Sequence, residues 1–341
     1  MPQSTNFYLA VPELIPEHAK LLDILPIVLE TTNNLLDFPL TLPAKKFHQT
    51  LQKHLNTLNT SHSGFSKADC IYIGTKGNED NDHAFNIIRS TDNLSLLMLS
   101  SALEAFNFIF KEAMQGGTTL DQTQWGRLIY ALYALLKLFK SEQSHTHNPP
   151  LISPPVMENT QRDALQRWTK GHYVFMVFCQ GLIIAINSFR NEVNAGNTAA
   201  ARYYLGIATS IMWGVESSFR FTGDYTYSEY EKSVRPTLTP PIAPEDMSGL
   251  HWRDHEQLVK QLINTKKIFN QLPSELHESR DSFYEAMSAS YDAHKFVCTQ
   301  FVGDESPSLL MQSRNQISAA DTLTNFKKSR LNTIHTKSTI S

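Results

Sequence analysis

Long segments with the apolar spacing of an α-helix make up most of this sequence, and they constrain the fold more than any other feature. In one of them Phe47, Leu51, Leu55 and Leu58 recur every three or four residues, which places them on one helical face. Such faces must pack against each other, so the sequence predicts an all-α, multi-helical single domain. Helices are expected at residues 17–36, 45–59, 92–114, 119–140, 162–192, 199–219, 249–271 and 273–301.

Several segments interrupt the helical pattern. Pro26 is expected to perturb the first helix, and Cys70–Gly74 could form a short strand or an extended loop. Residues 141–155 are polar and proline-rich and predict a linker, but the helices on both sides are apolar enough to need each other in one domain. Residues 220–248 are aromatic and proline-rich, which is typical of a binding loop.

The chain turns polar near its C-terminus. We therefore predict a helical domain over residues 1–303 and a polar C-terminal extension over residues 304–341. The stretch that begins at Lys327 is expected to be a loose tail, because terminal polar segments are poorly ordered unless they are tied down.

The composition excludes several classes of protein. The chain has 30 lysines and arginines against 33 acidic residues, a balance that lacks the broad basic surface of a general nucleic-acid binder. The sequence contains no G-x-G-x-x-G or P-loop motif for a dinucleotide or nucleotide. Its three cysteines, Cys70, Cys179 and Cys298, are widely spaced and cannot form a disulfide framework, which fits reduced thiols in the cytoplasm.

The apolar segments do not predict a membrane protein. The N-terminus has no basic region that leads into an apolar stretch, so a signal peptide is not expected. The most apolar run, Val174–Ile186, is shorter than the roughly 20 residues that cross a bilayer and predicts a buried core helix. We expect a soluble cytoplasmic protein with neither membrane nor nucleic-acid partners.

His294 and Cys298 form the strongest local signal for chemistry. Four residues apart on a helix, their imidazole and thiol point to the same side about one turn apart. The pair could contribute to a zinc site, but no Cys-x-x-Cys or second His/Cys pair supplies the remaining ligands. It could also be a Cys–His nucleophile pair, or bind haem with the imidazole on iron and the thiol near the porphyrin edge. A chance pairing in a chain with 13 histidines is the alternative without function.

His251 and His255 form a second group, at the start of the helix expected at residues 249–271. Four residues apart on a helix, they could ligate one metal, although the metalloprotease motif H-E-x-x-H is absent. They could equally belong to a solvated, polar helix start.

Carboxylates in apolar helices raise the possibility of a di-iron bundle. That class uses Glu-x-x-His pairs on core helices, and the one such sequence here, Glu142–His145, lies in the predicted linker. The polar residues of the apolar helices are therefore better explained as hydrogen-bonded parts of the core. They are Glu104, Glu112, His172 and Glu216.

His255, followed after 38 intervening residues by His294-x-x-x-Cys298, matches the pattern H-(x)n-H-x-x-x-C. This pattern resembles the haem-dependent tyrosine hydroxylases of natural-product pathways, above all the 3-methyl-L-tyrosine hydroxylases of saframycin and safracin biosynthesis. These are histidine-ligated haem-dependent aromatic oxygenases, a mostly helical superfamily that includes tryptophan 2,3-dioxygenase. The Gly-Thr-Gly-Gly run of the dioxygenase is replaced by Gly303-Asp-Glu-Ser, which favours the hydroxylase branch. The resemblance covers residues 200–303.

The resemblance implies a covalently attached haem. Cys298 would form a thioether to a haem vinyl group, His294 would be the proximal axial ligand, and His255 would be the second histidine. Neutral imidazole suits iron. With both histidines bound no position is left for peroxide, so His255 would have to move aside and could then act as general acid–base. The implied reaction uses hydrogen peroxide to place a hydroxyl ortho to the phenol of tyrosine or 3-methyltyrosine.

An amino-acid substrate needs a cation for its carboxylate and aromatic walls for its ring. We predict Arg253 for the carboxylate and Tyr225, Tyr227 and Trp252 for the ring, although each could be an ordinary packing residue. Two other functions stay open, a haem-dependent indole-ring dioxygenase and a non-enzymatic haem-binding or sensing protein. The resemblance also implies a homo-oligomer, and it leaves open which aromatic amino acid is preferred.

Overall fold

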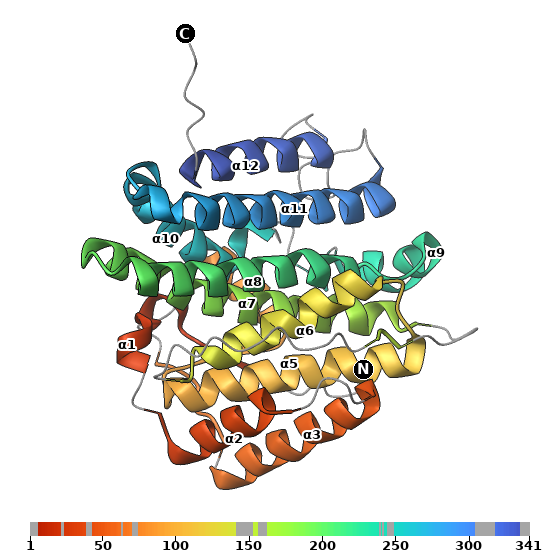
Figure 1. Ribbon diagram of the computed structural model, residues 1–341. Coiled ribbons are helices and arrows are strands. Elements are labelled where there is room, and N and C mark those ends of the chain that lie inside the picture. The colour runs from red at the N-terminus through yellow and green to blue at the C-terminus, as the bar shows by residue number, and fades with distance from the viewer. Residues whose placement is uncertain are drawn as a thin grey trace.

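The computed structural model describes residues 6–21, 24–38, 43–62, 64–69, 74–140, 153–155, 162–238, 240, 242–243, 249–303 and 318–334. Over these residues the chain is almost entirely helical, which confirms the all-α fold (Figure 1). Residues 70–73 of the predicted strand or loop and residues 141–152 of the predicted linker lie outside the described ranges.

Every segment expected to be helical from apolar periodicity contains a helix, although residues 17–36 form two, α1 (His18–Leu21) and α2, instead of one. The long helices are α2 (Pro26–Leu36), α3 (Ala44–Ser61), α5 (Leu94–Gly116), α6 (Gln122–Lys137), α7 (Ala164–Asn194), α8 (Thr198–Thr222), α10 (Arg253–Asn270) and α11 (His277–Val302). Four of them begin where a side chain can accept a hydrogen bond from the backbone N–H three residues on. These capping residues are Asn93, Asp121, Asp163 and Asn197.

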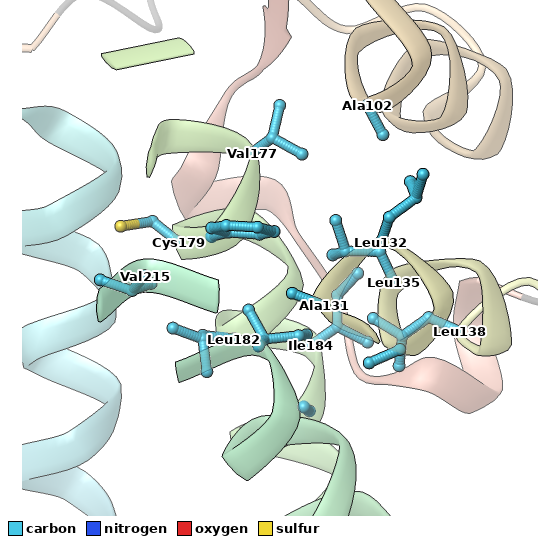
Figure 2. Close-up of a cluster of buried hydrophobic side chains, with 14 of the residues drawn as sticks. Ala102, Ala131, Leu132, Leu135, Leu138, Val177, Cys179, Leu182, Ile184 and Val215 are labelled. Carbon is cyan, nitrogen blue, oxygen red and sulfur yellow. The ribbon is translucent and has the colours of Figure 1, made fainter. Parts of the chain in front are cut away.

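The helices stack in layers (Figure 1). α2 and α3 lie at one end, α5 to α8 occupy the middle, and α10 and α11 follow on the other side of α7 and α8. The core between α6, α7 and α8 is apolar and closely packed (Figure 2). A Cβ at Gly181 would lie 2.1 Å from Leu135, and one at Gly214 would lie 2.2 Å from Ala131, so both glycines allow close approach of these helices.

A small parallel sheet is an addition that periodicity did not predict. Strand β1 (Phe7–Ala10) pairs with β2 (Ile87–Ser90), with Phe7 opposite Ile87. Phe7 also stacks on Tyr173 of α7, with ring centroids 4.0 Å apart. Each strand has only four residues and its partner is far away in sequence, so no local pattern could reveal the pair.

Two expectations about irregular segments need correction. Pro26 does not perturb one long helix but starts α2, because proline is accepted at the first helical position, where its missing N–H is not needed. Part of the segment 220–248 is regular. It contains the short helix α9 (Tyr227–Glu229), a π-helical turn (Tyr230–Val234) and a 3₁₀ turn (Arg235–Leu238). Thr226 caps α9 with a capping box, which explains the local order.

The predicted loose tail is also wrong in part. Residues 319–334 form α12 (Ala319–Ile334), which packs against α10 and α11 at the outer side of the bundle (Figure 1). Leu331 and Ile334 are buried in the main core, and Lys327 binds the carboxylate of Asp292 on α11 at 2.6 Å. Sequence polarity concealed this helix because its apolar residues cover only a narrow face.

Two helices, α5 and α7, are long and apolar enough to cross a membrane if only length and composition are considered. In α5 and α7 the most apolar stretch is 72% and 89% buried inside the protein, respectively. This burial is what core helices show, and it agrees with the core helix that the run Val174–Ile186 predicted.

Candidate functional site

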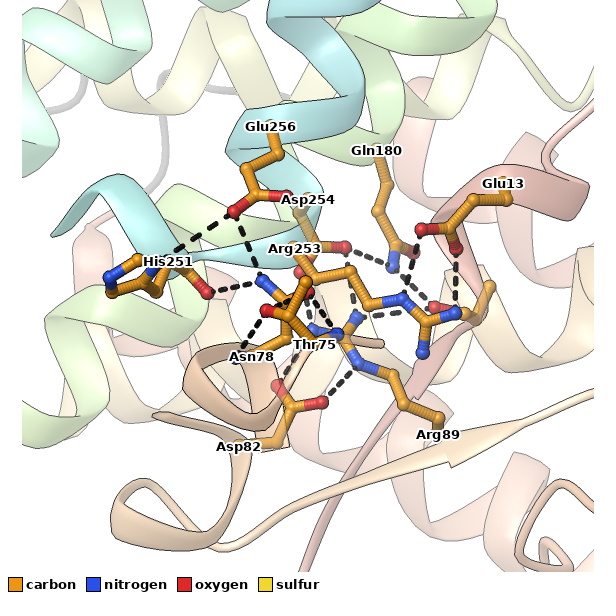
Figure 3. A network of polar contacts seen from close by, with 11 residues as sticks. Glu13, Thr75, Asn78, Asp82, Arg89, Gln180, His251, Arg253, Asp254 and Glu256 are labelled. Atoms are coloured by element: carbon orange, nitrogen blue, oxygen red, sulfur yellow. Dashed lines mark hydrogen bonds and ion pairs between the residues drawn. The ribbon is translucent and has the colours of Figure 1, made fainter. Parts of the chain in front are cut away.

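A buried network of ion pairs holds the first turn of α10 (Figure 3). Arg89 of β2 donates to both carboxylate oxygens of Asp254, at 3.0 and 2.7 Å, and to both oxygens of Asp82 on α4 (Lys76–Ala84), at 2.8 Å. Gln180 of α7 donates to Asp254 at 2.8 Å. Burial by itself would lower the pKa of Arg89, but the two carboxylates raise it, so the guanidinium stays charged. Because Asp254 directly precedes His255, this network positions His255.

Three histidines come together from three helices, His172 of α7, His255 of α10 and His294 of α11. His294 interacts electrostatically with both other rings. Desolvation is the main cause that lowers the pKa of each to about 4. All three are therefore neutral at pH 7 and can offer a ring lone pair. None is fully buried, so each keeps surface that a ligand can reach. We call these residues the histidine cluster.

His294 and Cys298 lie four residues apart within α11, as predicted, so they share one side of the helix. Burial raises the pKa of Cys298 to about 11, so its sulfur is a protonated thiol at neutral pH. The thiol is free, and its neighbourhood includes Tyr230 of the π-helical turn. The segment after α8 thus covers the end of α11 that carries the thiol.

Aromatic rings surround the histidine cluster. His294 stacks on Phe219 with centroids 4.7 Å apart, and His255 lies 6.0 Å from Phe175. Phe175 and Phe219 also lie 5.1 Å from each other, and neither is fully buried. A porphyrin has an apolar ring and an iron that binds imidazole. The two accessible aromatic rings beside two neutral imidazoles therefore suit a porphyrin.

The donor set also fits haem better than an isolated metal ion. Within the part of the chain that the structure describes, no three His, Cys, Asp or Glu side chains form a metal-holding group. A zinc ion would need about four protein ligands, whereas haem iron receives four nitrogens from its own macrocycle and needs only axial ligands. His255 and His294 can fill these positions.

His172 was expected to be a core histidine, and this holds only in part. Its Nδ1 lies 2.6 Å from the carbonyl oxygen of Trp168, so Nδ1 donates and the lone pair is on Nε2. Its ring stacks on Trp252 at 5.3 Å. However, its place beside His294 makes it part of the site. A lone histidine in a very apolar helix was the only sequence signal, and it does not distinguish the two roles.

The proposed pair of His251 and His255 does not form. His251 belongs to a 3₁₀ turn (Gly249–His251), and α10 starts only at Arg253, so the two residues do not share a helical face. Instead, the carbonyl oxygen of His251 accepts a hydrogen bond from Asn78 on α4 at 2.8 Å. Its ring lies 4.0 Å from the carboxylate of Glu256 (Figure 3).

The residues predicted to bind substrate have different surroundings. Arg253 is held by Glu13, with contacts of 3.0 and 2.9 Å (Figure 3). Trp252 is buried between His172 and Phe85. Tyr225 is buried and stacks on Phe301 at 4.9 Å, and its hydroxyl has no hydrogen-bond partner. Tyr227 is 54% exposed.

The carboxylates of the apolar helices serve as structural partners. Glu216 binds Arg127 and Arg220, and Glu112 lies 3.9 Å from the buried Arg167. Burial raises the pKa of Glu104, which faces Lys170. Glu112 and Glu216 are buried and lie beside arginines, which agrees with their interpretation as parts of the core.

Tyr291 and Arg330 are site residues that the sequence analysis missed. Arg330, on α12, acts electrostatically on His255 of α10 and on Tyr291 of α11. Both residues are partly buried. No motif connects residue 330 to residue 255, and only the docking of α12 brings them together.

Comparison with known proteins identifies the family. The sequence model of the SfmD 3-methyl-L-tyrosine peroxygenases matches residues 9–279, which is more than half of the chain. The chain belongs to the SfmD peroxygenase family. It is therefore similar to oxidoreductases, as the H-(x)n-H-x-x-x-C pattern indicated. The match includes His255 and ends before His294 and Cys298.

Two relatives of this peroxygenase family support the assignment. A 3-methyl-L-tyrosine peroxygenase from Streptomyces lavendulae is 36% identical over 263 residues, which cover 76% of this chain and 72% of that protein. The crystal structure of reduced SfmD, soaked with sodium hydrosulfite, matches with a TM-score of 0.73 and 29% identity. This match covers 85% of this chain and 96% of that one. The resemblance stated from sequence is confirmed at the level of family and fold.

Proposed function

We propose that this chain is a haem-dependent hydroxylase that uses hydrogen peroxide to place a hydroxyl ortho to the phenol of L-tyrosine or 3-methyl-L-tyrosine. The observation that carries the proposal is the approach of His255 and His294 from α10 and α11, in a member of a peroxygenase family. The product would be a catechol amino acid for natural-product biosynthesis. The aromatic amino acid and the peroxide would be its partners.

His294 and His255 would hold the haem through their imidazole nitrogens, and Cys298 would supply the thiol for a thioether to a vinyl group. Haem, when bound, supplies the oxidising chemistry that moves one oxygen atom from peroxide to the substrate. Low pKa values keep both imidazoles neutral, which ligation requires. When His255 is not bound to iron, its free ring nitrogen can accept or return a proton. Phe175 and Phe219, whose ring centroids lie 5.1 Å apart, supply apolar surface beside the two imidazoles.

The product of the haem-loaded protein tests this function. With hydrogen peroxide and L-tyrosine or 3-methyl-L-tyrosine, we expect a product that is heavier by one oxygen atom and has a catechol absorption spectrum. Mass spectrometry of the reaction mixture measures this change. Tryptophan serves as the comparison, since gain of two oxygen atoms by tryptophan would indicate ring opening instead. A protein that shows no Soret band after expression with adequate haem would refute the proposal.

Replacing Cys298 by serine tests the covalent attachment. Haem is expected to stay with the wild-type protein in acid–acetone and to be extracted completely from Cys298→Ser, because a hydroxyl does not form the thioether. The absorbance of the organic phase measures the released haem. Cys179→Ala is the matched control, since Cys179 is a buried core thiol of α7 and should leave haem attached. Extraction of haem from the wild type would contradict the thioether.

A further inference from the structure

The C-terminal helix α12 is fixed on the outer side of the histidine cluster. Lys327 binds both carboxylate oxygens of Asp292 on α11, at 2.6 and 2.7 Å, and Lys295 of α11 contacts the hydroxyl of Thr324 at 3.4 Å. Leu331 and Ile334 are buried beneath the helix. These contacts on both sides of position 330 determine where its side chain lies.

Arg330 extends from α12 towards the site. Its positive charge acts on Tyr291 of α11 and on His255 of α10. Its Nε atom is shielded from solvent and has no hydrogen-bond partner within the described ranges. None of the carboxylates in the described ranges forms an ion pair with Arg330. Among the residues that the structure describes, this partly buried cation, whose charge acts on His255, therefore has no anionic partner.

The three fully buried arginines in the described ranges each have a carboxylate partner. Arg89 binds Asp82 and Asp254, Arg167 binds Asp224 at 2.9 Å, and Arg253 binds Glu13 at 2.9 Å. Pairing is expected, because an uncompensated charge away from water is strongly destabilising. Arg330 is partly buried, and no carboxylate of the described residues pairs with it, although its charge acts on His255.

We propose that Arg330 binds a carboxylate of the molecule held at the histidine cluster, so that α12 completes the site. A guanidinium presents parallel N–H groups that fit the two oxygens of a carboxylate. Two sources offer this chemistry, the α-carboxylate of the amino-acid substrate and a haem propionate. Arg253, predicted for the substrate carboxylate, already has Glu13 as its partner. The inference rests on the proposed function, since that function supplies both carboxylates.

Binding of L-tyrosine and tyramine to the haem-loaded protein tests the proposal. Tyramine keeps the phenol and the amine but lacks the carboxylate. If Arg330 holds the substrate carboxylate, Arg330→Gln should weaken L-tyrosine binding at least about tenfold, equal to about 1.4 kcal/mol, and leave tyramine binding unchanged. Isothermal titration calorimetry measures both affinities. If Arg330 holds a propionate, both affinities should respond alike, and the reduction potential of the haem should shift.

Lys328→Gln is the matched control, because Lys328 is an exposed cation on the same helix. It should change neither affinity nor potential. Arg330→Lys provides a second variant with the charge retained, and circular dichroism checks that each variant is folded. If L-tyrosine affinity and reduction potential stay at wild-type values in both Arg330 variants, the proposal is wrong while the proposed function stands. A wild type without haem would instead refute the proposed function, and this inference with it.

Discussion

Replacing His255 by alanine is expected to lower peroxide-dependent hydroxylation by about 10²- to 10⁴-fold, the range over which a positioned general acid–base contributes. The same change should alter the resting absorption spectrum, because one axial imidazole is lost. The physical basis is the low pKa of His255, which keeps its ring neutral and able to ligate iron or accept a proton. Initial rates with L-tyrosine and spectra of the haem-loaded variant are the measurements.

His251→Ala is the control for that experiment. His251 lies four residues before His255, but its ring lies near the carboxylate of Glu256 (Figure 3) and near Gly77 of α4. Its replacement should leave the rate and the spectrum unchanged. A His255→Ala protein with the wild-type spectrum and turnover would disprove the role given to His255.

Replacing Arg89 by methionine is expected to lower the free energy of unfolding by about 3–5 kcal/mol, the cost of breaking a buried ion pair on one side. The variant leaves Asp82 and Asp254 without their cation, and Asp254 is fully buried. Urea unfolding followed by circular dichroism measures the change. Because Asp254 starts α10 one residue before His255, we also expect an altered haem spectrum.

An exposed ion pair provides the comparison for Arg89. Lys20 binds Glu17 at 2.9 Å, but its side chain is 71% exposed. Lys20→Met should therefore change the free energy of unfolding by only about 0–1 kcal/mol. An Arg89→Met protein as stable as Lys20→Met would show that the network in Figure 3 contributes little to the fold.

The long helices could be predicted from sequence because their signal is local. In α3, for example, Phe47 and Leu51 indicate the buried face within a single turn. The pair of strands could not be predicted in this way, because Phe7 pairs with Ile87, which lies 80 residues further along the chain. The helix predicted to start at residue 249 starts at Arg253, four residues later. Trp252 precedes the helix and packs on Phe85 and His172.

In the candidate site, too, local features could be predicted from sequence and long-range contacts could not. His294 and Cys298 could be paired from sequence because a helix brings residues four apart to one side. His172 could not be assigned, because a core histidine and a site histidine have the same neighbours along the chain. Arg330 was assigned to a tail, since only the packing of Leu331 and Ile334 turns that segment into a docked helix.

The sequence by itself therefore determined the all-α class, the helix that carries His294 and Cys298, and the family pattern that includes His255. These properties depend on the spacing of residues within one segment, and that spacing is the same whether the chain is folded or unfolded. Only the tertiary structure decided that α7, α10, α11 and α12 bring His172, His255, His294 and Arg330 together. The proximity of these residues depends on which apolar helix faces pack against each other. Burial in the folded protein then lowers the pKa values of the three histidines.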